Sequence, residues 1–244
     1  DLIKGIFKNF DKEIFKRYIR DCWPLAFTGL FGIFMLNIDI VMLGWWRTPE
    51  EIGYYSASQR IVQILYTLPA ILASAAFPAM TRFIKQNELI RARNLNEKSM
   101  TFLYLIAVPL AIGGIILSAP IIEFIFGKAY LPATISLQIL IATVLIQFPG
   151  AIFGNLIMAH NQQKKLVKYV AIGSFSNVFF NILLIPLYGI NGSAIATLIS
   201  QFAYFAPVWV KIKQISDFKT IRHLKKIIAA GIIMGVFGYF LNRF

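Results

Sequence analysis

The chain is short of charge. Only 14% of its 244 residues are Asp, Glu, Lys or Arg, whereas 58% are hydrophobic, and an average soluble domain has about 25% charged residues. One core of this size could not enclose so many apolar side chains, and the rest would face water. The composition therefore excludes a soluble enzyme and a disordered chain. It predicts a protein that crosses a membrane several times.

Cysteine and histidine are also scarce. Cys22 is the only cysteine, which excludes an intrachain disulfide and a cysteine-based metal cluster, and the two histidines fall in expected loops. The sequence has no HExxH or GxSxG motif and no phosphate-binding loop. We therefore expect no enzymatic activity, no cofactor and no metal site. ATP-driven transport by this chain alone is excluded, so energy has to come from an ion gradient, the membrane potential or use of the product.

Seven apolar segments are long enough to cross the hydrocarbon core, which takes about 20 residues of helix. They cover residues 23–46, 56–81, 100–122, 133–159, 166–187, 192–210 and 226–242. Lipid offers no water to the backbone, so each segment must be a helix or part of a closed barrel. Barrel strands alternate over about ten residues, and these segments do not. The predicted fold class is an all-α polytopic helical bundle.

The basic residues fix an expected orientation. The net charge is +13, but no continuous basic face suggests a nucleic-acid partner. Twenty of the 24 Lys and Arg residues occupy alternate segments: six before the first span, five between 82 and 98, three between 164 and 168, and six between 211 and 226. Only Arg47, Lys128 and Arg243 lie in the opposite segments. The positive-inside rule then places the N-terminus and the basic loops in the cytoplasm.

Residues 2–19 are expected to form a separate cationic, amphipathic helix, because apolar residues recur there at helical spacing between lysines. Such a helix fits the cytoplasmic headgroup region or the surface of a neighbouring protein. We divide the chain into a linker helix at 1–22, a six-helix lobe at 23–215, and a loop with the start of a further span at 216–244. The chain is expected to be a fragment of a longer protein.

Proline and small residues shape the spans. Proline occurs within or at the ends of spans at positions 69, 78, 109, 120, 149, 186 and 207. These prolines suit a transporter that rocks, although proline is also common in membrane helices generally. Gly192, Ala196 and Ser200 form a stripe of small residues, and only Gly189–Asn191 separates spans five and six. We predict a tight antiparallel hairpin there, which is a packing feature.

Polar residues inside the expected spans are the candidates for function. They are Asn37, Asp39, Arg60, Gln147, Asn177, Asn181 and Gln201. Each amide taken alone is best explained as a hydrogen bond between helices. Asp39 and Arg60 are ionisable and costly in lipid, which favours a functional role. Both lie seven residues from the expected turn between spans one and two, so we predict that they meet as an ion pair or face a wet cavity.

Several stretches resemble the C-terminal half of polysaccharide-exporting flippases, which belong to the multidrug/oligosaccharidyl-lipid/polysaccharide exporter superfamily. The stretches are Asp39–Gly44 (DIVMLG), Gly53–Arg60 (GYYSASQR), Phe77-Pro78, Ile122–Tyr130 (IEFIFGKAY), Gln138–Leu140 (QIL), Asn177–Gly189 (NVFFNILLIPLYG) and Asn191–Thr197 (NGSAIAT). Together they span residues 20–215. Each motif is loose alone, but their order and spacing are fairly specific.

The resemblance implies a lobe of a transporter with twelve to fourteen helices in the cell membrane, with the N-terminal lobe missing. It implies a polyprenyl-pyrophosphate-linked oligosaccharide as substrate, for cell-surface polysaccharide biosynthesis. The implied partners are membrane lipids, this lipid-linked substrate, the missing lobe, and polysaccharide polymerase or assembly proteins. Among the candidates we assign Arg60, Asp39, Asn37, Gln147, Asn177 and Asn181 to substrate binding and translocation.

Two other functions stay open from the sequence. One is a cation-coupled multidrug or metabolite antiporter of the same superfamily, in which buried carboxylates carry the coupling ion. Asp39 is the only carboxylate available here for that role. The other is a membrane scaffold for envelope biosynthesis enzymes, without transport. Accumulation of lipid-linked sugar on depletion favours the flippase, and drug sensitivity favours the antiporter.

Overall fold

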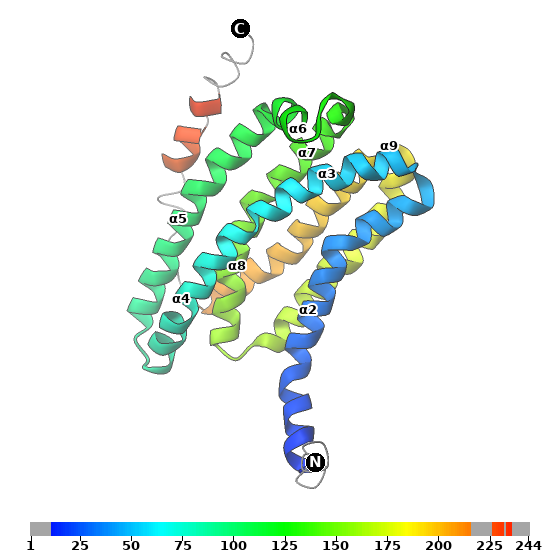
Figure 1. Ribbon diagram of the computed structural model, residues 1–244. Coiled ribbons are helices and arrows are strands. Elements are labelled where there is room, and N and C mark those ends of the chain that lie inside the picture. Colours follow the sequence, from blue (N-terminus) through cyan, green and yellow to red (C-terminus); the bar gives the residue numbers. More distant parts are fainter. Residues whose placement is uncertain (1–10, 216–225, 232, 236–244) are drawn as a thin grey trace, which may run out of the picture.

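The computed structural model describes residues 11–215, 226–231 and 233–235, and these residues form a helical bundle without a strand (Figure 1). The elements are α2 (Lys12–Trp46), α3 (Pro49–Leu65), α4 (Thr67–Lys85), α5 (Leu89–Ile116), α6 (Ser118–Phe126), the 3₁₀ helix η1 (Lys128–Ala133), α7 (Thr134–Ala142), α8 (Val144–Ala159) and α9 (Gln163–Ile215). The expected all-α membrane bundle is confirmed.

Five helical segments are long and apolar enough to span a membrane in the described part of the chain: Cys22–Trp46, Pro49–Lys85, Leu89–Ile116, Lys128–Ala159 and Gln163–Ile215. The last has 53 residues, about 80 Å of helix, far more than a bilayer needs. It turns back at Gly189, whose φ of 58° and ψ of −134° break the helix. Six of the seven expected spans are thus accounted for.

The seventh expected span, 226–242, lies partly outside the described residues. Residues 226–231 and 233–235 are helical. They pack on α5, because a Cβ atom added to Gly231 would lie 2.4 Å from Val108 Cγ1. The beginning of this span therefore belongs to the bundle.

Two helix breaks follow directly from proline. Pro69 and Pro120 have no N–H to donate to the carbonyl four residues earlier. Those carbonyls belong to Leu65 and Ile116, which are the last residues of α3 and α5. The second expected span is therefore two helices, α3 and α4, that meet at Tyr66.

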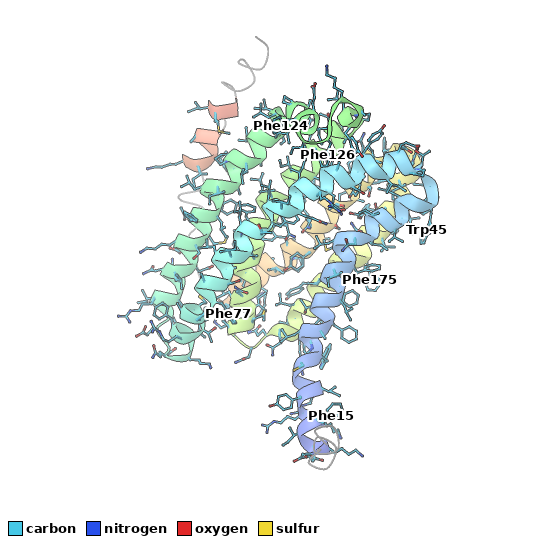
Figure 2. The ribbon with its side chains drawn as sticks, in the orientation of Figure 1. Phe15, Trp45, Phe77, Phe124, Phe126 and Phe175 are labelled. Carbon is cyan, nitrogen blue, oxygen red and sulfur yellow. The ribbon has the colours of Figure 1, made fainter. Side chains whose placement is uncertain are left out.

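The α2 helix is longer than the span predicted from the sequence. Its 35 residues measure about 52 Å against a hydrocarbon core of about 30 Å. Asp11 caps it, accepting from the backbone N–H groups of Glu13 (2.8 Å) and Ile14 (3.2 Å). Residues 12–22 continue into the first span without a break and project from the bundle, with Phe15 exposed (Figures 1 and 2). The boundary expected at residue 22 is not a helix end, and residues 1–10 of the expected linker helix lie outside the described residues.

The connections that carry basic residues lie toward one end of the bundle. The start of α2, the α4–α5 and α8–α9 turns and the end of α9 are near the bottom of Figure 1, whereas the α2–α3 turn, α6 and the Gly189 turn are near the top. Phe124 and Phe126 mark the upper end and Phe15 the lower one in Figure 2. The fold thus keeps the predicted alternation of basic and nearly uncharged connections.

Arg47 joins the two turns at the upper end. Its Nη2 donates to the carbonyls of Ile185 (2.6 Å) and Pro186 (3.0 Å). These carbonyls would normally accept from residues 189 and 190, but the chain turns away at Gly189. Glu51 lies 4.0 Å from Arg47 Nη1. Arg47 therefore acts as a helix cap supplied by a distant part of the chain.

The two halves of α9 form the predicted tight antiparallel hairpin. A Cβ atom added to Gly192 would lie 2.1 Å from the carbonyl oxygen of Leu184, and one added to Gly173 would lie 2.9 Å from Tyr204 Cβ. Farther along, Asn177 Nδ2 donates to Ser200 Oγ at 3.4 Å. The small residues let the two backbones approach closely, as expected.

Candidate functional site

The most unusual group in the bundle is the carboxylate of Asp39, which is 0% exposed and lies about two turns before the C-terminal end of α2. Its Oδ2 accepts hydrogen bonds from Tyr55 Oη (2.8 Å) and Thr197 Oγ1 (2.7 Å). Its Oδ1 accepts from Asn181 Nδ2 (2.7 Å). An ionisable group buried at this depth needs such partners, and all three are neutral.

The three partners come from three chain segments. Tyr55 lies on α3, and Asn181 and Thr197 lie on the two halves of α9. Residues near 39 and 55 face each other because the α2–α3 turn lies midway between them. The hairpin at Gly189 likewise brings 181 opposite 197. The site therefore depends on both turns that Arg47 joins.

The polar network continues along α9 beyond the carboxylate. Asn181 Nδ2 also donates to Asn177 Oδ1 (3.0 Å), one helical turn earlier. Asn177 reaches Ser200, whose hydroxyl donates to the carbonyl of Thr197 (2.8 Å). Tyr55 and Thr197 hydroxyl oxygens lie 3.3 Å apart. All of these side chains are at most 9% exposed, so the network is closed off from bulk solvent.

Not every polar atom in and around the network is paired. Among the described residues, the buried Asn181 Oδ1, Gln201 Oε1 and Ser193 Oγ have no hydrogen-bond partner. A carboxylate beside spare carbonyl oxygens suits a proton, a water molecule or a small hard cation with oxygen ligands. The described residues include no group of three or more His, Cys, Asp or Glu that could hold a metal ion.

The predicted ion pair between Asp39 and Arg60 is wrong. Arg60 is exposed, and no described residue is its ion-pair partner. The prediction placed Arg60 seven residues after the turn between the first two spans, at Gly53, but the turn ends earlier because α3 begins at Pro49. Gln59 Nε2 in fact donates to the carbonyl of Leu36 (2.7 Å), so Arg60 lies about one turn beyond the level of Asp39.

Of the other sequence candidates, the structure brings Asn177 and Asn181 to Asp39 and leaves Asn37 and Gln147 apart from it. Asn37 is exposed, and its amide donates to the carbonyl of Ile33 (2.8 Å) on its own helix. Gln147 is half-buried on α8.

Sequence reasoning missed Tyr55 and Thr197, because a single tyrosine or threonine is unremarkable in an apolar segment. Both lie within the stretches that resemble flippases, Gly53–Arg60 and Asn191–Thr197, and this was the one available signal.

Comparisons with known proteins identify the family and the fold of the chain. The sequence profile described as "Polysaccharide biosynthesis protein" matches residues 6–135, more than half of the chain. The chain is 26% identical over 215 residues to the probable low-salt glycan biosynthesis flippase Agl15 of Haloferax volcanii, covering 85% of this chain and 45% of that protein. It is 26% identical over 204 residues to the capsular polysaccharide biosynthesis protein CapF of Staphylococcus aureus, covering 84% of this chain and 50% of the relative. The chain thus spans about half the length of these relatives.

Solved structures show the same fold. The lipid II flippase MurJ in an inward closed conformation superposes with a TM-score of 0.79 at 21% identity, covering 99% of this chain and 52% of that one. An outward-facing multidrug transporter of the MATE family superposes with a TM-score of 0.71 at 18% identity, covering 90% and 52%. The bundle described above therefore has the fold of about half of each of these two chains.

Proposed function

Since the chain belongs to the family of polysaccharide biosynthesis proteins, we propose that it forms the C-terminal lobe of a flippase that moves a lipid-linked oligosaccharide from the cytoplasmic to the outer leaflet. The observation that carries the proposal is the family match together with the similarity to a probable glycan biosynthesis flippase along 85% of the chain. Several of the matching relatives are named as flippases or as polysaccharide biosynthesis proteins, which supports transport as the activity. The proposed lobe comprises residues 23–215, and an upstream lobe completes the cavity.

In this proposal, Arg60 and Asn37 contact the substrate. Both side chains are exposed. Arg60 directly follows Gln59 on α3, and Asn37 directly follows Leu36 on α2. Gln59 donates a hydrogen bond to the carbonyl of Leu36 and so links the two helices. Because the helices are antiparallel and each residue turns the helix by about 100°, the two side chains fall on the same side of the helix pair. A guanidinium without an ion-pair partner among the described residues is suited to the bidentate binding of a pyrophosphate. Gln147 is assigned to the translocation path with them.

The Asp39 network is proposed as the place where transport is coupled to a proton or a small cation. A carboxylate with neutral partners changes its charge when it takes up either one. Asn177 and Asn181 act with Asp39 because their amides contact it directly or through each other. The same network would serve the alternative function, a cation-coupled antiporter, which the names of the relatives do not favour.

The proposed orientation places the N-terminal end of α2 and the basic loops in the cytoplasm. We expect a cysteine introduced at Glu50 to react with an impermeant maleimide in intact cells, in a Cys22→Ser background. A cysteine introduced at Arg91 should react only after permeabilisation. Labelling in the reverse order would contradict both the orientation and the direction of transport.

Depletion of the full-length protein in its host tests the function. We expect lipid-linked oligosaccharide to accumulate on the cytoplasmic side, because it is made there and cannot cross unaided. Right-side-out vesicles are treated with an impermeant glycosidase, and the glycolipid is then extracted. The readout is the fraction of glycolipid that the glycosidase has not cleaved. Wild-type protein should reverse the accumulation, whereas Arg60→Ala should not and Arg60→Lys should do so only in part.

Arg60 has no ion-pair partner among the described residues, so its loss should leave expression and thermal stability unchanged. Full activity of Arg60→Ala would remove this residue from the substrate site. Drug sensitivity without glycolipid accumulation would instead favour the antiporter.

A further inference from the structure

The two ends of α9 lie together at the open end of its hairpin, near the bottom of Figure 1, and carry only positive charge. Along its 53 residues α9 has no Asp or Glu, and all of its lysines are near its ends. They are Lys164, Lys165, Lys168, Lys211 and Lys213. In the described part of the chain, none of them takes part in an ion pair. The charge of this end is therefore not neutralised by a described residue.

The hairpin brings two of these charges together. The close antiparallel contact between the two halves of α9 continues to this end and places Lys165 opposite Lys211. Their ammonium groups act on each other directly and repel. Lys165 Nζ donates to Gln162 Oε1 at 3.0 Å, and Lys211 Nζ donates to Gln214 Oε1 at 3.3 Å. Since an ammonium group has three protons, each lysine keeps donors for a further acceptor.

Two other features make this pair of cations unfavourable by itself. Lys211 is half-buried, and Lys165 lies in the first turn of α9, where the helix dipole disfavours a positive charge. The first turn has no acidic residue that would offset it. The helices cannot move apart easily, because Gly173 and Gly192 hold their backbones in close contact. An anion placed between the two lysines would offset the repulsion and the dipole together.

We propose that Lys165 and Lys211 together bind the phosphate group of an anionic phospholipid. A phosphate oxygen accepts short, charge-assisted hydrogen bonds from ammonium groups. Basic groups between helices at one end of a membrane bundle are suited to such headgroups. The inference goes beyond the proposed function, because this site needs neither a glycan nor transport.

The surroundings of the lysines favour a lipid over a free anion. Lys213 Nζ lies 5.7 Å from the ring centre of Trp209, and tryptophan is typical of the level where a membrane meets water. Phe202, Ala206 and Val210 recur every four residues on the same half of α9, and all three are exposed. This apolar stripe runs from the lysines toward the middle of the bundle, so a lipid bound by its phosphate can lay an acyl chain along it.

The test measures lipid binding by the purified full-length protein in an uncharged detergent. Dioleoyl phosphatidylglycerol is titrated, and native mass spectrometry gives the dissociation constant of the first lipid bound. Inorganic pyrophosphate is titrated in parallel. The variant is Lys165→Gln with Lys211→Gln. The matched control is Lys12→Gln with Lys16→Gln, which removes the same charge from two exposed positions one turn apart on α2.

We expect the Lys165→Gln/Lys211→Gln protein to bind phosphatidylglycerol at least about tenfold more weakly than wild type, and the control to bind like wild type. Arginine at both positions keeps the charge and should keep the affinity. Equal affinities of the variant and the control would overturn the inference. Binding of pyrophosphate without binding of phosphatidylglycerol would overturn the assignment to a lipid.

The unfolding temperature provides an independent measurement. Without lipid, Lys211→Gln should raise it, because the substitution removes the repulsion from Lys165. Added phosphatidylglycerol should then stabilise the wild type more than the variant, which reverses their order. An unfolding temperature that falls on Lys211→Gln and does not respond to lipid would contradict the site. Loss of flipping with unchanged lipid binding would contradict the proposed function and leave this site standing.

Discussion

Asp39→Ala is expected to abolish transport by the full-length protein and to lower its free energy of unfolding by about 3 kcal/mol or more. The change removes the common acceptor of Tyr55, Thr197 and Asn181 and leaves three buried donors without it. Each buried donor left unsatisfied costs about 1–3 kcal/mol. Thermal unfolding of the purified protein in detergent measures the stability, and the glycolipid assay measures transport.

The Asp39→Asn substitution separates the role of the carboxylate's charge from its role in stabilising the fold. The amide keeps one oxygen as an acceptor, and the hydroxyls of Tyr55 and Thr197 can rotate to accept from its nitrogen, so we expect a loss of only about 1 kcal/mol. Transport should nevertheless be lost if the carboxylate carries the coupling charge. Asn37→Ala is the control for stability, because Asn37 is exposed on the same helix and bonds only to its own backbone. Normal transport by a stable Asp39→Asn protein would show that Asp39 is purely structural.

Gly192→Ala is expected to destabilise the lobe by about 2–3 kcal/mol, which is large for one methyl group. The added carbon would lie 2.1 Å from the carbonyl oxygen and 2.6 Å from the carbonyl carbon of Leu184. These are backbone atoms, so the hairpin has to open, and overpacking of this kind costs about 1–3 kcal/mol. Since Asn181 and Thr197 face each other across this hairpin, transport should fall together with the unfolding temperature.

Gly154→Ala is the matched control for that substitution. Gly154 is also helical, but a Cβ atom there would meet nothing within 4 Å. Replacing a helical glycine by alanine in open space stabilises by about 0.5–1 kcal/mol. A Gly192→Ala protein as stable as the Gly154→Ala protein would show that the two halves of α9 are not held in this close contact.

The candidate site shows where prediction from sequence stops. Asp39, Asn177 and Asn181 were identifiable because polar groups are expensive in lipid, and the structure brings all three together. The expected partner of Asp39 was wrong, since it depended on where α3 begins. Thr48 accepts from the backbone N–H of Glu51 in a capping box that starts α3 at Pro49, four residues before the point assumed. The turn therefore lies midway between Asp39 and Tyr55, which face each other, and Arg60 lies five residues farther along α3.

The sequence by itself determined the class of the fold, the approximate spans and the alternation of basic connections. These follow from the free-energy cost of exposing backbone polar groups and charges to lipid. This cost acts on each segment independently of the others. The breaks at Leu65 and Ile116 were not predicted, because other prolines remain inside helices and the sequence does not single out these two.

Only the tertiary structure decided which helices meet. The network around Asp39 and the Arg47 cap on the Gly189 turn each join residues more than 130 positions apart. Such contacts depend on helix register and on the angle of two turns, and no periodicity along the chain encodes either one.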